Sequence, residues 1–462
     1  MSEIKTTIIP EKQTFATIKG ASKAIDYEAI CAFVATGFFL DNDTYWTHKK
    51  VLRPGTINQL DDEGNLISSS KYFEWYHNPN KNLTFDDSVE AFGDLFERII
   101  AEQVDDKKVI LPLSGGLDSR TQAVALSALG KKVSAYSYAF KGGYPEHKIG
   151  RKIAKQCHFE FQEFLIQPEY LWDDIEQLAK INECYSEFTH PRQMAVINQF
   201  EQMGAIFSLG HWGDVLFDDM GVPDNLDFES QIEVLKKKII KPSGLLLAKK
   251  LWKHFQCDGN FEDYLHERFS DLHKKIDIQN SANARIRAFK SEYWAPRWTS
   301  INLSIFSEVR PITVPYYHND MCEFICEIPE QFLANRAIQI EYIKRKNPKL
   351  AHIVWHQQKP FNLHNYQYNK SPYNLPYRVL SKLSRIGKEL MDKPLIQRNW
   401  EMHFLGESNQ ERLKHYLFQS DFIPKDLALN VLDEFNTKDQ VFHAHALSTL
   451  LTLSLWDKLY ND

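Results

Sequence analysis

The most restrictive stretch of the sequence is a glycine-rich turn, Ser114-Gly115-Gly116-Leu117-Asp118-Ser119, which follows an apolar run and precedes a helical pattern. Two adjacent glycines let the backbone turn tightly, so that its N–H groups can approach phosphate oxygens. The hydroxyls of Ser114 and Ser119 add donors at a helix N-terminus, where the helix dipole favours anions. Asp118 supplies a carboxylate of the kind that Mg²⁺ prefers. The stretch therefore predicts a phosphate-binding turn, although an ordinary strand-to-helix turn has a similar composition.

The segments around this turn alternate between strand and helix patterns, which is typical of an α/β core with a parallel sheet. We expect strands at 109–113, 133–140, 159–166 and 205–208, and helices at 85–103, 119–129 and 146–157. A Pro-Gly turn and a hairpin turn predict short strands between residues 51 and 65. From about residue 230 the pattern is mainly helical. The predicted fold is thus a parallel-sheet core with an α-rich C-terminal lobe.

Composition excludes several classes of protein. The 462 residues suit two or three packed units, and a net charge of −6 provides no overall attraction to nucleic acid. Lys236, Lys237 and Lys238 could touch RNA, but they suit the solvated face of a helix. The six cysteines form no CxxC pair, and no apolar run is long enough to span a membrane. These features predict a cytoplasmic enzyme that contacts neither nucleic acid nor membrane.

A second glycine-rich turn lies in the stretch 208–219, Ser-Leu-Gly-His-Trp-Gly-Asp-Val-Leu-Phe-Asp-Asp. With the first turn it resembles the synthetase domain of the asparagine synthetase family, in the ATP pyrophosphatase (PP-loop) superfamily, whose core is adenine nucleotide alpha hydrolase-like. The first turn also lacks the lysine of a Walker loop, so cleavage between the α- and β-phosphates of ATP is implied. The resemblance implies that Asp118 and Asp214 bind Mg²⁺. The residues expected to bind ATP and pyrophosphate are Leu113, Ser114, Gly115, Gly116, Asp118, Ser119 and Gly210.

Two further residues are candidates for catalysis. His211 stands where the asparagine-forming enzymes carry Glu, which removes an anionic group and argues against aspartate as the substrate. The imidazole could act as a general base or a hydrogen-bond donor, or it could be structural. Lys359, in the stretch 354–361, is similar to a family lysine that reaches the reacting phosphate, although a lone lysine is more often a surface residue.

Weaker matches lie elsewhere along the chain. Residues 308–310 and 314–320 resemble another family segment, with His318 where the family has Asp. Glu146 is expected near the nucleotide, or else as a carboxylate that complements a helix dipole. Ser2 stands in place of the nucleophilic cysteine of a glutaminase, and residues 27–72 resemble only the end of that domain. We therefore divide the chain into a segment at 1–84 and an asparagine synthetase-like domain at 85–462.

The predicted reaction is an ATP-dependent, AMP-forming ligation. A small-molecule or peptide carboxylate is adenylated, pyrophosphate leaves, and ammonia or an amine captures the acyl group. Without a glutaminase of its own, the enzyme would take free ammonia, ammonia from a separate glutaminase, or a substrate amine. The alternatives are a non-catalytic nucleotide-binding relative and a PP-loop RNA-modifying enzyme.

Overall fold

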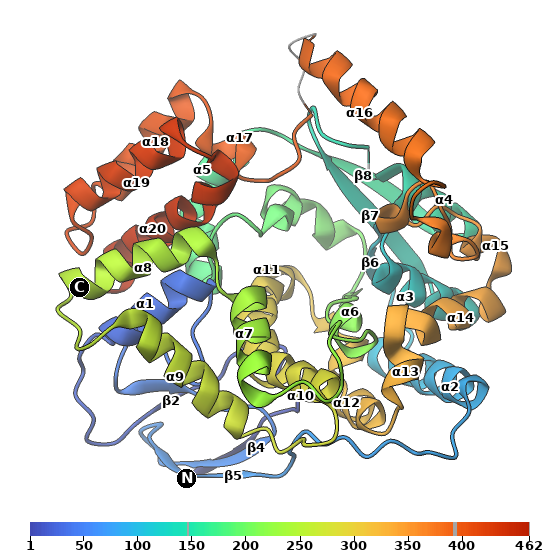
Figure 1. Cartoon of the computed structure of the whole chain (residues 1–462), viewed down its shortest axis with the longest axis horizontal. Helices are drawn as coiled ribbons and strands as arrows, with labels where there is room; N and C mark the ends of the chain where they lie inside the picture. The colour runs from blue at the N-terminus through green and yellow to red at the C-terminus, as the bar shows by residue number, and fades with distance from the viewer. Residues whose placement is uncertain (146, 391–394, 462) are drawn as a thin grey trace.

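A five-stranded parallel sheet with the strand order β10-β9-β6-β7-β8 forms the centre of the protein. The structure is a computed structural model that describes residues 1–145, 147–390 and 395–461. The strands of this sheet are β6 (Val109–Pro112), β7 (Val133–Phe140), β8 (Glu160–Ile166), β9 (Ile206–Ser208) and β10 (Ile312–Thr313). The predicted parallel α/β core is confirmed (Figure 1).

Helices before and between these strands cover the sheet. They are α2 (Phe85–Val104), α3 (Leu117–Ala128), α4 (His147–Gln156), α5 (Tyr170–Asn182), η1 (Arg192–Gln202) and α6 (Gly213–Leu216). Phe200 of η1 and Phe306 pack against Phe207 of β9, while α4 packs against β7 and β8. A capping box between Thr84 and Asp87 fixes the start of α2. The predicted Glu146 lies outside the described residues, so its role is a prediction only.

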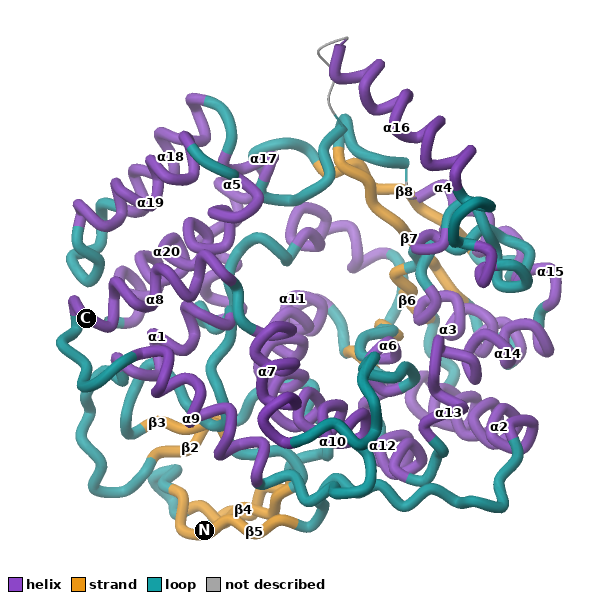
Figure 2. The backbone as a smooth tube through the Cα atoms, in the orientation of Figure 1, coloured by secondary structure: helices purple, strands orange, loops and turns teal. Residues whose placement is uncertain are grey.

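The chain beyond β9 is mainly helical, as predicted, with β10 as the one strand in its described part. The first elements here are α7 (Phe228–Ile239), α8 (Pro242–His254), α9 (Phe261–Lys274), α10 (Ala282–Phe289), the π-helix η2 (Lys290–Thr299), α11 (Ser300–Val309), η3 (Pro315–Tyr317), α12 (Asn319–Cys326), α13 (Glu330–Leu333) and η4 (Ala334–Arg336). The remainder are α14 (Ala337–Lys346), α15 (Pro348–Ala351), η5 (His356–Gln358), η6 (Tyr366–Tyr368), α16 (Leu375–Leu390), α17 (Glu401–Phe404), α18 (Glu407–Leu417), α19 (Lys425–Thr437) and α20 (Gln440–Tyr460). The last four helices gather beside α8 and α5, and α16 extends away from them above β8 (Figure 2).

The first 84 residues form small antiparallel sheets and one helix. The elements are β1 (Ser2–Lys5), β2 (Phe15–Thr17), α1 (Tyr27–Thr36), β3 (Lys49–Val51), β4 (Thr56–Leu60) and β5 (Leu66–Lys71), with sheet orders β1-β4-β5 and β2-β3. The predicted hairpin joins β4 and β5, and its turn is held by Asp61, which accepts from the N–H of Asn65 at 2.8 Å.

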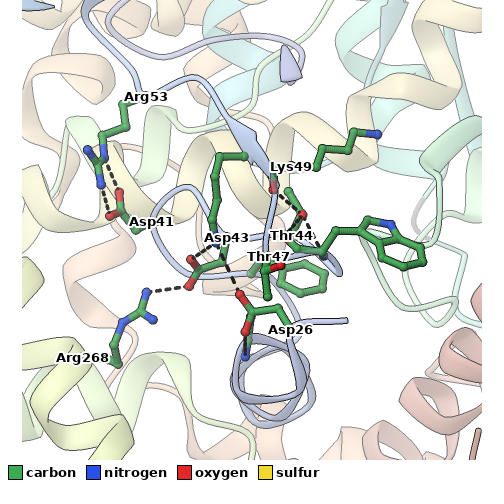
Figure 3. Close-up of polar contacts among 12 residues, drawn as sticks. Asp26, Asp41, Asp43, Thr44, Thr47, Lys49, Arg53 and Arg268 are labelled. Atoms are coloured by element: carbon green, nitrogen blue, oxygen red, sulfur yellow. Dashed lines mark hydrogen bonds and ion pairs between the residues drawn. The ribbon is translucent and has the colours of Figure 1, made fainter. Parts of the chain in front are cut away.

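An ion pair and apolar contacts connect this segment to the rest of the chain, and Figure 3 shows the ion pair, which Asp43 forms with Arg268. Asp43 accepts from Arg268 of α9 at 2.6 Å and from Lys50 at 3.2 Å, and Asp41 pairs with Arg53. Helix α1 packs on α8 within the main hydrophobic core. The division of the chain at residue 84 stays a prediction.

Candidate functional site

The candidate site lies where the strand order of the parallel sheet reverses. From β6 the chain proceeds outward through β7 and β8, and then returns to place β9 on the other side of β6. Ligands of open α/β sheets bind in the crevice at the carboxyl ends of the strands on either side of such a switch. The first glycine turn (114–119) follows β6, the second (209–214) follows β9, and both line a cavity of about 610 Å³.

The first glycine turn presents backbone donors and hydroxyls at the start of α3. The N–H of Gly116 donates to Ser114 Oγ at 3.1 Å, and the N–H of Ser114 donates to Ser119 Oγ at 3.2 Å. Gly116 is the N-cap of α3 and provides no side-chain cap for the first N–H groups of this 12-residue helix. Such N–H groups and the helix dipole favour an anion. The turn therefore fits a phosphate group.

Gly115 is covered by a segment that comes from far along the chain. A Cβ at Gly115 would lie 2.8 Å from the Cβ of His356, whose N–H donates to the carbonyl of Gly115 at 3.0 Å. Buried Arg120 of α3 donates to the carbonyls of Ile353 and Val354 at 2.9 and 2.8 Å. Gly115 is thus needed for this crossing. The other predicted phosphate-binding residues, Leu113, Ser114, Gly116, Asp118, Ser119 and Gly210, line the cavity.

The two glycine turns are pressed against each other. A Cβ at Gly210 would lie 3.2 Å from the Cβ of Asp118, and one at Gly213 would lie 2.2 Å from Asp118 Oδ1. Only a residue without a side chain fits at Gly213. The contact brings Asp118 close to Asp214 of the second turn. Burial raises the pKa of Asp118 to about 6; the charge of Arg336 opposes this shift and that of Asp214 adds to it.

Asp118 is held in one orientation by two residues that the sequence did not reveal. Arg336 and Gln339 both donate to Asp118 Oδ1, and Gln339 also donates to the hydroxyl of buried Tyr316 at 2.6 Å. In the described structure Oδ2 accepts no hydrogen bond, so this oxygen can face a ligand. Asn335 and Arg336 have positive φ angles of 57° and 62°. No glycine marks this bend, so no local sequence pattern predicts it.

The carboxylates of Asp118 and Asp214 fit a magnesium ion that arrives with a nucleotide. Mg²⁺ is usually bound by one or two carboxylates together with substrate phosphates and water. The described residues contain no group of three or more side chains that could hold a metal by themselves. Two carboxylates beside a phosphate-binding turn therefore match this mode of binding better than a closed protein site.

His211 lies in the cavity with an unusual environment. Burial lowers the pKa of its imidazole to about 4, and the charge of Asp214 opposes that shift only in part. The ring is therefore neutral at neutral pH. Its Nδ1 atom is buried and forms no hydrogen bond within the described structure. His211 can accept or donate a hydrogen bond to a ligand, but it is a weak proton acceptor.

The segment that contains Lys359 lies against the first glycine turn, but the Lys359 side chain does not line the cavity. Its segment crosses Gly115, and Gln357 lines the cavity, but half-buried Lys359 is not among the lining side chains. Its contact with a phosphate stays a prediction. Two residues of the weaker match at 308–320 can be placed. Tyr316 packs against Gly213 of the second turn. His318 caps α12, and its ring accepts from the N–H of Asp320 at 3.3 Å.

A second group of side chains that line the cavity, which we call the helical wall, was not predicted. It consists of His190, Arg192, Lys290, Trp294, Trp298, Asn302 and Phe306. The Lys290 amine lies 5.1 Å from the ring of Trp294 and 5.8 Å from that of Trp212. Burial lowers its pKa to about 8, with Asp214 opposing, and no described carboxylate forms an ion pair with it. A cation that lines the cavity beside two tryptophan rings suits an organic acid.

Comparisons with known proteins bear on this site. Residues 91–300 match the family model described as asparagine synthase. No curated protein matches the sequence. Among solved structures, the chain is similar to an NMN synthetase from Francisella tularensis, with 13% identity, coverage of 45% of this chain and 93% of that one, and a TM-score of 0.22. This last similarity is too slight to indicate a substrate. The resemblance inferred from the two glycine turns is confirmed: over residues 91–300 the chain carries an asparagine synthase domain.

Proposed function

We propose that the protein uses ATP to adenylate a carboxylate, releases pyrophosphate, and transfers the acyl group to ammonia or an amine. The observation that carries this proposal is the pair of glycine turns pressed together around Asp118, beside a cavity that Lys290 also lines. A phosphate-binding turn alone would suit many nucleotide enzymes. A phosphate site and an organic-acid site in one cavity suit the activation of an acid by ATP.

Each group of residues in the cavity has a separate role in the proposed reaction. The N–H groups at the start of α3 and the hydroxyls of Ser114 and Ser119 would bind the departing pyrophosphate. Asp118 and Asp214 would hold Mg²⁺, which when bound offsets the charge of the phosphates. Lys290 would orient the substrate carboxylate toward the α-phosphate. Lys359 is proposed to approach the reacting phosphate, with His211 as a neutral hydrogen-bonding group.

The proposed reaction needs a source of nitrogen. Ammonia, an amine on the substrate or a separate glutaminase could supply it, and the enzyme would act in the cytoplasm. No helix among the described residues has the length and apolar character needed to cross a membrane.

The proposal is tested by product analysis with purified protein, ATP and magnesium chloride. The acids offered are amino acids, dicarboxylic acids, aromatic acids and uronic acids, and hydroxylamine is added to trap any activated acid as a hydroxamate. We expect AMP, pyrophosphate and a hydroxamate with at least one acid. ADP and orthophosphate as products, or ATP binding with no AMP from any acid, would overturn the proposal.

A matched pair of variants tests the metal-binding role. We expect Asp118→Asn to lower hydroxamate formation by about 100-fold or more, because it removes a charge that the site needs. Asp219→Asn makes the same chemical change a few residues beyond the second turn and outside the cavity lining, so its activity should equal that of the wild type. Equal activity of Asp118→Asn and the wild type would remove Asp118 from the mechanism.

A further inference from the structure

A buried carboxylate, Glu187, holds a histidine at the edge of the cavity. His190 lines the cavity, and its Nε2 lies 2.9 Å from Glu187 Oε1. The side chain of Glu187 is 2% exposed, whereas that of His190 is 45% exposed. The pair therefore joins a buried anion to a ring that both cavity and solvent can reach.

Glu187 is fixed so that only one of its oxygens is left for the histidine. Its Oε2 accepts from the hydroxyl of Ser448 in α20 at 2.6 Å, from the N–H of Thr189 at 2.7 Å and from the hydroxyl of Thr189. The Ser448 hydroxyl in turn accepts from the N–H of Phe188 at 3.1 Å. Burial raises the pKa of Glu187, but the charge and hydrogen bond of His190, the charge of His445 and the hydrogen bond from Ser448 outweigh it and lower the pKa well below its ordinary value. Glu187 is thus an anion.

The anionic state of Glu187 fixes the tautomer of His190. An ionised carboxylate can only accept hydrogen bonds, so in the neutral form of His190 the remaining proton must lie on Nε2. The lone pair is then on Nδ1, which forms no hydrogen bond within the described structure. The ring also packs edge-on against Trp298, with centroids 5.2 Å apart. A base whose orientation and tautomer are set by a third group is the arrangement that activates nucleophiles in many enzymes.

We propose that His190, held by Glu187, is the general base that accepts the proton of the attacking amine. In this step, which rests on the proposed function, the amine nitrogen attacks the acyl carbon of the acyl-adenylate. The C–N bond forms, the bond from that carbon to the phosphate oxygen breaks, and AMP leaves with the electron pair. The nitrogen loses one proton to His190 Nδ1. Glu187 balances the resulting imidazolium, which returns the proton to solvent.

The other histidine of the cavity is less suited to this task. His211 is half-buried, lies close to Asp214 and forms no ion pair with a described carboxylate, so no carboxylate fixes its tautomer or directly balances an imidazolium there. His190 also lies on the helical wall, on the side where the organic acid would sit. The two histidines thus have separate roles, His211 at the nucleotide and His190 at the amine.

The test measures the two half-reactions separately in a His190→Ala variant. With the acid that gives a hydroxamate in the wild type, we expect ATP–pyrophosphate exchange to be unchanged, because adenylation needs no base. Amide formation from ammonium chloride, glycine, ethanolamine or lysine should fall by about 100-fold or more. Hydroxamate formation should fall far less, because hydroxylamine is a much weaker base than these amines and loses its proton readily to water. Added imidazole should restore part of the amide formation.

The matched control is His266→Ala. His266 of α9 also faces a glutamate, Glu229, at 3.7 Å, but it lies outside the cavity lining, and both half-reactions should be unchanged. Glu187→Gln should lower amide formation and spare exchange; because Glu187 is buried, His190→Asn, at an exposed position, serves as the second variant if Glu187→Gln does not fold.

Three results would overturn the inference. Equal losses of exchange and amide formation in His190→Ala would show a structural role, and unchanged amide formation would show no role. A wild-type enzyme that exchanges pyrophosphate but forms an amide with none of the four amines would leave no capture step for a base. If no acid supports exchange in the wild type, the proposed function itself is wrong and this inference falls with it.

Discussion

The two walls of the cavity are built by different means. The wall formed by the two glycine turns presents mostly backbone and short side chains, and its shape depends on contacts such as the one between Gly213 and Asp118. The helical wall presents long and aromatic side chains from η1, η2 and α11, among them Lys290 and Trp298. Backbone contacts leave little room for variation, whereas side chains can be exchanged without disturbing the fold. The comparison suggests that the first wall sets the reaction with ATP and the second selects the acid and the amine.

The largest expected effect comes from adding one methyl group to the turn wall. In Gly213→Ala the new Cβ would meet Asp118 Oδ1 and the ring of Tyr316, so the two turns must separate. A displacement of this kind should lower adenylation by about 100-fold, and the overpacking should cost about 1–3 kcal/mol of folding stability. Pyrophosphate exchange and thermal melting measure the two effects.

The same change in an open position is the control for this prediction. Gly387 of α16 has free space around it, so Gly387→Ala should keep full activity and stability. If Gly213→Ala were as active as Gly387→Ala, the close contact between the two turns would not be required for adenylation.

A smaller effect is expected from the helical wall. Lys290→Met keeps the length of the side chain but removes the cation, so the KM for the acid should rise by about tenfold or more while the KM for ATP stays the same. Steady-state kinetics with each substrate varied in turn measure the two constants, and Lys237→Met, at an exposed position of α7, is the control. A parallel rise in the KM for ATP would contradict the division of labour between the walls.

His211 should tolerate a neutral replacement. Because its imidazole is neutral at neutral pH, His211→Gln keeps a group that can donate and accept hydrogen bonds, and the loss in kcat should stay within about tenfold. A loss of about 100-fold or more would instead identify His211 as a proton-transfer group. Measuring kcat in both half-reactions distinguishes these outcomes from those expected for His190.

The smallest effect concerns stability in acid, away from both walls. Burial lowers the pKa of His403 in α17 from its ordinary value of 6.5 to about 3, and neither ring nitrogen has a hydrogen-bond partner within the described structure. The unfolded chain therefore binds a proton more readily than the folded one below about pH 6.5. The contribution of neutral His403 to the free energy of unfolding is fully present above that pH. It is lost by about 1.4 kcal/mol per pH unit as the pH falls toward 3.

His403→Leu should remove that part of the acid sensitivity. Melting temperatures between pH 7 and pH 4 should fall less steeply in the variant, with no change in activity at neutral pH. An identical slope in both proteins would show that His403 does not contribute.

The turn wall could be predicted from the sequence because its residues are contiguous and their spacing reflects backbone geometry. The strand β7 has the predicted bounds, and α3 begins at Leu117, two residues before the predicted start, because the turn is tighter than the pattern alone indicated. The mainly helical region was predicted only in outline. Its π-helix, η2, contains Pro296, which local propensity would place at the end of a helix.

The helical wall and the residues that hold Glu187 and Asp118 in place could not be predicted, because the residues that come together are distant in the chain. Ser448 and Glu187 are 261 positions apart, and Arg336 and Asp118 are 218 apart. No spacing rule connects such pairs, and a buried glutamate has no local signature that separates it from an exposed one. Lys290 likewise looks like any lysine in a helical segment until the fold surrounds it with tryptophans.

The hydrogen bond from Ser448 to Glu187 has a practical consequence for the boundaries of the working enzyme. The asparagine synthase match ends at residue 300, yet the groups that orient Asp118 come from positions 336 and 339, and the anchor of the His190 pair comes from the final helix. A shortened protein cut at the limits of the family match would lose both supports. Even a bulky fusion that disturbs α20 would displace Glu187, some 260 positions earlier in the chain, where the amine is expected to bind.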